Sequence, residues 1–336
     1  MKLRGGAAPE HVRAFLRKVI ACEGAAPHMT ARMTELAIIF EHPRWFEPLF
    51  AALDRRGIDY RPIEWGNHHF DLAEGPPAKV VFNRLAMSAF LREPEHPIFH
   101  AAAALDHMRR GGADIINGPE VLALDSSKAR QLSLFRSLGL AIPATRVVHR
   151  AADLIAAAEG MRFPLLVKAN IGGAGAGIVR FDTHGELAGA VRDGIVPTSI
   201  DNVLLLQDYV PARGGTVLRL ETLGGKFLYA LEVATGDAFD LCPADACVAQ
   251  PGRAAISMTA VDPGPELTAA AERIAQASGL DVGGVEVVMD DRDGALRFYD
   301  FNALSNFVAK PLEVLGWDPH ERLVDLLEQR LERASS

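Results

Sequence analysis

The stretch GGVEVVMDDRDGALRFYDFNALSNF, residues 283–307, decides the fold of this chain. Two runs rich in β-branched and aromatic residues, VEVVM and ALRFYDF, flank the turn-forming residues DDRDG and predict a β-hairpin. If the turn is centred on residues 292–294, the strands pair Glu286 with Asp300. Because side chains alternate along a strand, Asn302 then shares a face with Asp300.

This face of the predicted hairpin carries two carboxylates and a carboxamide. Such oxygen ligands suit one or two magnesium ions, with manganese as a substitute. Two opposed carboxylates without a cation would destabilise the hairpin. The sequence therefore predicts a metal site at Glu286, Asp300 and Asn302, with an exposed acidic hairpin as the alternative.

A second candidate site lies in LVKANIGGAGAGIVRF, residues 166–181. Lys168 ends a buried strand, and a loop rich in glycine follows it. Backbone N–H groups of such a loop can contact phosphate oxygens because no side chains intervene. The glycines of this loop are Gly172, Gly173, Gly175 and Gly177.

Two familiar phosphate-binding motifs do not fit this loop. A Walker A loop requires Gly-Lys-Ser/Thr, but Ile178 and Val179 follow Gly177. The dinucleotide fingerprint fails because Ile178 occupies its last glycine position. A strand follows the loop, so we predict a phosphate flap between two strands, with a tight hairpin as the alternative.

Composition excludes several classes of protein. The chain has 336 residues, a net charge of −8 and three cysteines. The negative charge gives no electrostatic reason to expect nucleic acid or an anionic membrane as a partner, and no apolar run is long enough to span a membrane. The first residues do not resemble a secretory signal, and the few cysteines suit a reducing cytoplasm. We expect Cys242 and Cys247 to be substrate-facing or buried thiols, since zinc sites use closer pairs.

The N-terminal third divides into two parts. Residues 1–33 predict an amphipathic helix and a linker. Residues 34–122 alternate strands with helices, which predicts a parallel, doubly wound α/β domain. Arg84 follows a strand end of this domain, where open α/β sheets bind ligands, so it is a candidate clamp for a substrate carboxylate or a structural ion pair.

The segment NVLLLQDYV, residues 202–210, predicts a strand of four apolar residues that leads into Gln207-Asp208-Tyr209-Val210. The backbone at such a strand end can hydrogen-bond to an adenine ring. A core strand without ligand contacts is the alternative.

The order of these elements over residues 80–307 resembles the ATP-grasp superfamily, and most closely its RimK-like branch of carboxylate–amine ligases. The similarity includes VVFNRLAMS, IINGPEVLALDSSKARQL and LAIPATRVV. The resemblance implies an ATP-grasp fold of mixed α/β (α+β) class behind a pre-ATP-grasp domain. It places a small subdomain at 123–209 and a large subdomain, with the metal site and the C-terminal helix, at 210–333.

The resemblance also implies a role for each candidate residue. Lys128 and Lys168 would hold the nucleotide phosphates, and the glycine flap would close over them. Lys168 and Arg219 would act in catalysis, and the hinge from Gln207 to Val210 would bind the base. The residues near the substrates would be Arg84, Arg219, Cys242 and Asn306.

The implied activity is ATP-dependent formation of an amide bond through an acylphosphate, with magnesium and with amino acid or peptide substrates. A homodimer or homotetramer would fit the family. The alternative is a nucleotide-binding member that has lost ligase activity. Departures from the family pattern at Val217, Glu232 and Val233 concern the substrate more than the fold.

Overall fold

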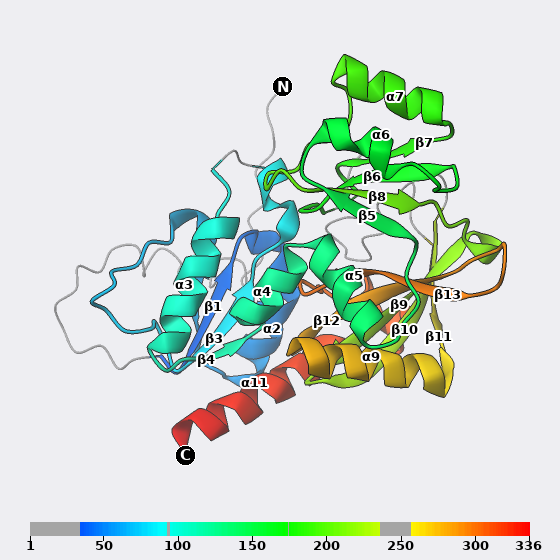
Figure 1. The fold of residues 1–336 in the computed structure, drawn as a ribbon. Coiled ribbons are helices and arrows are strands. Elements are labelled where there is room, and N and C mark those ends of the chain that lie inside the picture. Colours follow the sequence, from blue (N-terminus) through cyan, green and yellow to red (C-terminus); the bar gives the residue numbers. More distant parts are fainter. Residues whose placement is uncertain (1–33, 93–94, 174, 236–256) are drawn as a thin grey trace, which may run out of the picture. The chain divides into compact units, whose positions relative to one another are not determined.

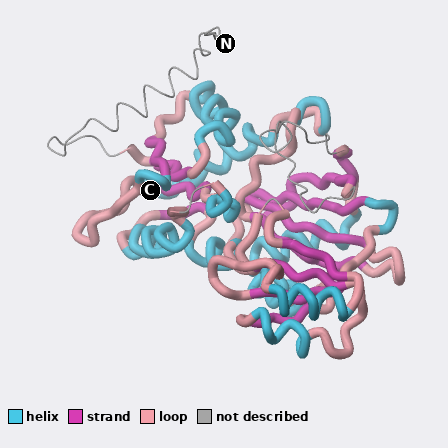
Figure 2. Tube along the Cα trace, turned by 90° about the horizontal axis from the view of Figure 1, so that it is seen from above, coloured by secondary structure: helices cyan, strands magenta, loops and turns pink. Residues whose placement is uncertain are grey.

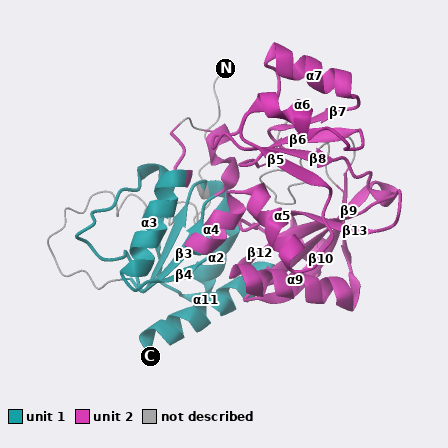
Figure 3. Ribbon diagram, viewed as in Figure 1, with its two compact units in different colours: residues 1–85, 99–118, 318–336 teal, residues 86–98, 119–317 magenta. Residues whose placement is uncertain are grey.

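The structure, a computed structural model, describes residues 34–92, 95–173, 175–235 and 257–336. The chain forms two compact units (Figure 3). Unit 1 comprises Met1–Leu85, Phe99–Gly118 and Asp318–Ser336, and unit 2 comprises Ala86–Ile98 and Pro119–Trp317. The helix expected within residues 1–33 and both Cys242 and Cys247 lie outside the described residues.

Unit 1 is built on a parallel sheet with the strand order β2-β1-β3-β4 (Figure 1). Its elements are β1 (Leu36–Phe40), α2 (Glu47–Arg56), β2 (Arg61–Glu64), β3 (Val80–Arg84), α3 (Ile98–Arg110) and β4 (Asp114–Ile116). Strands β1 and β3 are buried throughout, as expected when both faces of a sheet are covered. The order changes direction at β1, so right-handed crossovers place α2 and α3 on opposite faces.

The C-terminal helix α11 (Pro319–Ser335) groups with unit 1, whereas we expected it in the large subdomain. The guanidinium of Arg330 donates to the carboxylate of Asp114 at 2.6 Å. Arg56 of α2 forms an ion pair with Glu328. These contacts join residues far apart in the sequence and assign the helix to unit 1. Local sequence patterns do not predict such contacts.

Unit 2 contains a first antiparallel sheet with the order β5-β8-β6-β7. The elements of this region are β5 (Thr145–Val148), α6 (Leu154–Ala157), β6 (Leu165–Ala169), β7 (Ile178–Phe181), α7 (His184–Asp193) and β8 (Leu204–Asp208). Leu154 and Leu187 of the two helices pack with Val167 and Leu206 of the sheet. Helices α6 and α7 thus lie on the same side of this sheet (Figure 1).

A second antiparallel sheet of unit 2 has the order β11-β10-β9-β12-β13. Its strands are β9 (Thr216–Leu223), β10 (Lys226–Ala234), β11 (Met258–Val261), β12 (Val282–Met289) and β13 (Leu296–Asn302). The helices of this region are α4 (Pro119–Asp125), α5 (Lys128–Ser137), α9 (Gly264–Ser278) and α10 (Pro311–Val314). Figure 2 shows the strands gathered into sheets with helices beside them.

One face of the five-stranded sheet contributes to a second hydrophobic core of unit 2. Leu220, Val285 and Phe301 pack there against Phe135 of α5 and Ile274 of α9. Because side chains alternate along a strand, the residues next to these point to the other face. That second face therefore presents the polar residues of β9, β12 and β13.

No helix in the described part of the chain is long and apolar enough to cross a membrane.

Candidate functional site

The hairpin β12–β13 pairs Glu286 with Asp300, as the sequence predicts. Nearer the turn the register differs by one residue, because Val287 pairs with Phe298. A uniform ladder continued from that pair would put Tyr299 opposite Glu286. A β-bulge at this point inserts one extra residue and restores the predicted pair.

The bulge brings three oxygen-bearing side chains together. Asn302 Nδ2 donates to Glu286 Oε1 at 3.3 Å, and Glu286 is only 6% exposed. Burial raises the pKa of Glu286, and the negative charge of Asp300 raises it further, while Arg219 opposes this rise. The carboxylate pair would therefore gain from a bound cation.

Lys128 partly meets this need at the start of helix α5. Its Nζ donates to Asp300 Oδ1. Burial lowers the pKa of Lys128, but the carboxylates of Asp300, Glu286 and Asp125 together outweigh burial and leave the pKa above its ordinary value. The helix start is fixed by Asn170, whose Oδ1 accepts from the backbone N–H of Ala129 at 3.0 Å and from the Ser127 hydroxyl at 3.2 Å.

Lys168 approaches the same hairpin from the end of β6. It is 7% exposed, and its Nζ lies 5.8 Å from the centre of the Tyr299 ring. Burial and the positive charge of Lys128 lower the pKa of Lys168 to about 8, although Asp300 and Glu286 act in the opposite direction. A buried lysine whose charge is disfavoured is suited to receive an anionic group.

Arg219 of β9 lies between two carboxylates. Its Nη1 donates to Glu286 at 3.2 Å, and its Nε donates to Glu221 at 2.6 Å. Glu221 is completely buried, and the missing side chain of Gly284 on β12 leaves room for it. Sequence reasoning missed Glu221, although its position two residues after Arg219 on one strand was a usable signal.

Backbone conformation and close packing both act on the glycines of the loop. Gly175 and Gly177 both have a φ of 71°, a backbone conformation that glycine adopts readily and other residues rarely do. A tight hairpin without ligand contacts would require glycine at these positions for the same reason. A Cβ on Gly173 would lie 2.8 Å from the Cβ of Ser88, so the loop packs closely against that residue. A Cβ on Gly172 would lie 3.9 Å from Cε of Lys128, which places the loop beside a candidate phosphate-binding lysine.

The hinge after β8 is held by several hydrogen bonds. Gln207 Nε2 donates to Thr145 Oγ1 at 2.9 Å, and the Tyr209 N–H donates to the Pro164 carbonyl at 3.1 Å. Asp208 forms ion pairs with Arg162 and Arg292. The backbone expected to contact a base thus has a defined conformation.

Arg84 and Asn306 are the other two described candidates for contact with substrate. Arg84 is in unit 1, where its guanidinium lies 5.1 Å from the ring centre of Phe46 and 4.9 Å from that of Phe82. Asn306 lies half-buried, four residues beyond the end of β13. The structure therefore brings together Lys128, Lys168, Arg219, Glu286, Asp300 and Asn302.

The donor set fits a hard cation. Among the residues the structure describes, no three His, Cys, Asp or Glu side chains form a metal-binding group. The candidate at the hairpin instead combines two carboxylates with the carboxamide of Asn302, which are the oxygen donors that magnesium prefers. The raised pKa of Glu286 indicates the same need for positive charge.

Two antiparallel sheets, one with a glycine flap and one with an acidic hairpin, define the ATP-grasp class of fold. D-alanine–D-alanine ligase from Bacillus anthracis, complexed with ATP, has this fold with a TM-score of 0.65 over 91% of this chain and 99% of that one, at 14% identity. The ATP-grasp ligase PsnB, complexed with a minimal precursor, Mg and ADP, gives a TM-score of 0.63 over 90% of this chain and 99% of that one, at 16% identity.

The family described as the RimK-like ATP-grasp domain matches residues 125–311, and the chain belongs to this family. A probable alpha-L-glutamate ligase from Aeromonas salmonicida is 27% identical over 203 residues. That match covers 58% of this chain and 62% of the relative, so the chain matches less than two thirds of the relative's length. The fold and the family predicted from the sequence are both confirmed.

Proposed function

We propose that this chain is an ATP- and magnesium-dependent carboxylate–amine ligase. The observation that carries the proposal is the cluster on the polar face of the five-stranded sheet. There Glu286 and Asp300 oppose each other, Lys128 binds Asp300, and Lys168 lies above Tyr299. Acidic groups that need a cation and a buried lysine, Lys168, whose charge is stabilised by an anion are the two halves of a metal–nucleotide site.

Each half of the cluster has its own role in the proposed reaction. Lys128 and Lys168 bind the phosphate oxygens of ATP, and Arg219 stabilises the negative charge that develops on the γ-phosphate. The glycine loop beside Lys128 covers the phosphates and excludes water. The backbone of Gln207, Tyr209 and Val210 binds the base.

Glu286, Asp300 and Asn302 would hold one or two magnesium ions. The metal supplies Lewis-acid stabilisation of phosphate oxygens. The chain's own contribution is the bulged hairpin, which sets the two carboxylates opposite each other.

The proposed chemistry has two steps. A carboxylate oxygen of the acid substrate attacks the γ-phosphorus of ATP, and ADP leaves. The amine substrate then attacks the acyl carbon of the acylphosphate, inorganic phosphate leaves, and the nitrogen loses a proton to give an amide. Family relatives support amino acids or peptides as substrates, since one is named a glutamate ligase and PsnB is complexed with a precursor.

A nucleotide-binding protein without ligase activity is the second candidate. The contacts of Arg219 favour it, because two carboxylates already engage the guanidinium that would otherwise face phosphate. The two candidates differ in whether ADP release depends on an added acid and amine.

The experiment begins with a screen of amino acid and peptide pairs, glutamate included, for phosphate release with ATP and magnesium. The acid substrate identified in the screen is then supplied with heavy oxygen in its carboxylate, and the mass of the released phosphate is measured by mass spectrometry. One labelled oxygen in phosphate is expected, because the carboxylate oxygen that attacked phosphorus leaves with it. Unlabelled phosphate alongside accumulating amide would falsify the acylphosphate mechanism, and ADP release independent of both substrates would favour the second candidate.

A further inference from the structure

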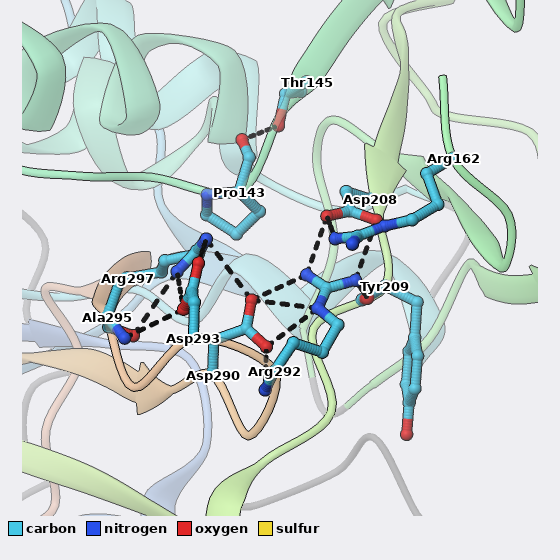
Figure 4. Close-up of polar contacts among 10 residues, drawn as sticks. All are labelled: Pro143, Thr145, Arg162, Asp208, Tyr209, Asp290, Arg292, Asp293, Ala295 and Arg297. Atoms are coloured by element: carbon cyan, nitrogen blue, oxygen red, sulfur yellow. Dashed lines mark hydrogen bonds and ion pairs between the residues drawn. The ribbon is translucent and has the colours of Figure 1, made fainter. Parts of the chain in front are cut away.

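The turn of the β12–β13 hairpin carries an arginine that reaches the hinge (Figure 4). On the turn side, Arg292 Nε donates to Asp290 Oδ1 at 2.8 Å and Nη2 donates to Asp290 Oδ2 at 2.7 Å. On the hinge side, Nη2 donates to Asp208 Oδ2 at 2.8 Å, and Nη1 donates to Asp208 Oδ1 at 3.3 Å and to the carbonyl oxygen of Tyr209 at 3.1 Å. All five N–H groups of the guanidinium are used. We call Arg292, Asp208, Asp290 and the Tyr209 carbonyl the hinge clasp.

The backbone of the turn holds the chain just beyond the hinge. Asp291 N–H donates to the Pro211 carbonyl at 2.9 Å, and Ala212 forms an isolated β-bridge with Asp290. Side-chain and main-chain bonds from one turn therefore hold the chain from Asp208 to Ala212.

Asp290 fixes the orientation of the arginine. It is completely buried and also accepts from the backbone N–H of Arg292 at 3.0 Å. Arg297 adds an ion pair with Asp290 at 3.3 Å, and Arg297 is itself held by Asp293 at 2.6 Å. A planar guanidinium bound along one edge by a buried carboxylate presents its other N–H groups in fixed directions.

The neighbouring arginines differ from Arg292. Arg162 also contacts Asp208, at 3.3 Å, but its side chain is 61% exposed, and exposed ion pairs contribute little. Arg213 lies beside the same turn, and its hydrogen bonds go to Asp291 and the sulfur of Met289. The described bonds of Arg292 alone, among these three, reach the Tyr209 carbonyl.

The carbonyl of Tyr209 belongs to the hinge backbone that is proposed to bind the base, and it already accepts from Arg292. A carbonyl oxygen has two lone pairs, and the bond from Arg292 uses one of them. The second can accept from a donor such as the exocyclic amino group of adenine. A charged donor on the first lone pair holds the peptide group in place before any ligand arrives, which reduces the entropy lost on binding.

We propose that Arg292 is a positioning residue for the purine base, acting through the hinge clasp to orient the Tyr209 carbonyl toward an amino group at position 6. The inference rests on the proposed function, because it requires a nucleotide at the hinge. Arg292 touches neither the substrate nor the reacting atoms. It makes the metal-binding hairpin and the base-binding hinge a single connected structure.

The test is isothermal titration of the full chain with ADP and with inosine diphosphate, both with magnesium. Inosine carries an oxygen at position 6 in place of the amino group, so the ratio of the two affinities reports on the contact at that position. Arg292→Ala removes the clasp. Arg292→Lys keeps a charge beside the buried Asp290 and so protects the fold, but one ammonium group cannot reproduce the planar fork. Arg213→Ala is the matched control on the same turn.

We expect the unaltered chain to prefer ADP. Both Arg292 variants should bind ADP about tenfold more weakly, as expected for loss of a charge-assisted hydrogen bond. Their affinity for inosine diphosphate should change less, so their preference for ADP over inosine diphosphate should be smaller. The control Arg213→Ala should bind both diphosphates as the unaltered chain does.

Two results would overturn the inference while leaving the proposed function intact. One is a folded Arg292→Lys protein with unchanged affinity for both diphosphates. The other is equal weakening for both, which would make Arg292 a merely structural residue. Absence of nucleotide binding by the unaltered chain would overturn the proposed function itself, and this inference with it.

Discussion

Two charged clusters of unit 2 contain the same kinds of side chain but differ in how well their charges are matched. In the hinge clasp, hydrogen bonds from Arg292 lower the pKa of Asp290, and Asp290 in turn raises the pKa of Arg292. The Asp290 carboxylate and the Arg292 guanidinium thus each favour the ionised form of the other. In the cluster of Lys128, Lys168, Glu286 and Asp300, which we call the site cluster, burial lowers the pKa of Lys168 to about 8 and raises that of Glu286.

The difference separates a structural role from a binding role. A cluster whose members satisfy one another needs no ligand. Lys128 is already matched by Asp300, but burial opposes the charged forms of Lys168 and Glu286. Such groups are stabilised when ions of opposite sign arrive, here a metal for the carboxylates and a phosphate for Lys168. One hairpin carries both clusters, the clasp at its turn and the site at its open end.

The largest expected effect is on turnover after Asp300→Asn. Loss of this carboxylate should lower the rate of ADP release about 10²–10³-fold, as removal of an electrostatic stabiliser does. Thermal unfolding should change little, because Lys128 loses a partner while Glu286 loses a repulsive neighbour. Asp293→Asn, the same substitution at the turn, is the control and should keep its rate. Near-normal turnover of Asp300→Asn would contradict the metal assignment.

A smaller effect, on stability, is expected for Asp290→Asn in the clasp. The substitution removes the charge and replaces one buried accepting oxygen with an NH2 donor, which should lower the free energy of unfolding by roughly 1–3 kcal/mol. Because the pKa of Asp290 is below its ordinary value of 3.8, its contribution is present above that pH and is lost on acidification. Urea unfolding at pH 7 and at pH 3 should therefore show a difference between variant and unaltered chain that narrows at pH 3. A difference that persists unchanged would mean that the ionised form of Asp290 is not what stabilises the clasp.

The smallest expected effect is the pH dependence of nucleotide binding. The pKa of Lys168 is about 8, so the lysine loses its proton as the pH rises through that value and must regain it to bind phosphate. Affinity for ADP with magnesium should fall above pH 8, by at most about tenfold per pH unit. Lys168→Arg stays charged and should abolish the dependence, whereas Lys168→Ala should bind weakly at every pH. Isothermal titration calorimetry between pH 7 and pH 9.5 measures the affinity of each protein for ADP. If Lys168→Ala binds ADP at pH 7 as tightly as the unaltered chain does, Lys168 does not bind phosphate.

The sequence determined most of the local structure. Alternation of apolar residues predicted the strands, and the order of the motifs predicted the ATP-grasp fold, which the comparisons confirm. Sequence reasoning missed three helices, α4, α7 and α10. The start of α7 carries a local signal: the Thr183 hydroxyl accepts from the Glu186 N–H, and the Glu186 carboxylate accepts from the Asp182 N–H. That signal is local, so the omission of α7 was avoidable.

Other features were decided only by tertiary structure. The sequence predicted the pairing of Glu286 with Asp300, but no turn rule anticipates the bulge at Tyr299 by which the strands reach it. Placement of α11 in unit 1 and the reach of Arg292 to Tyr209 join residues far apart in sequence. Periodicity and turn signals are set by neighbours within a few residues, and so they can be found in the sequence. Burial, the pKa of Lys168 and the ends of long side chains depend on which distant strands pack together, and only the folded chain brings those strands into contact.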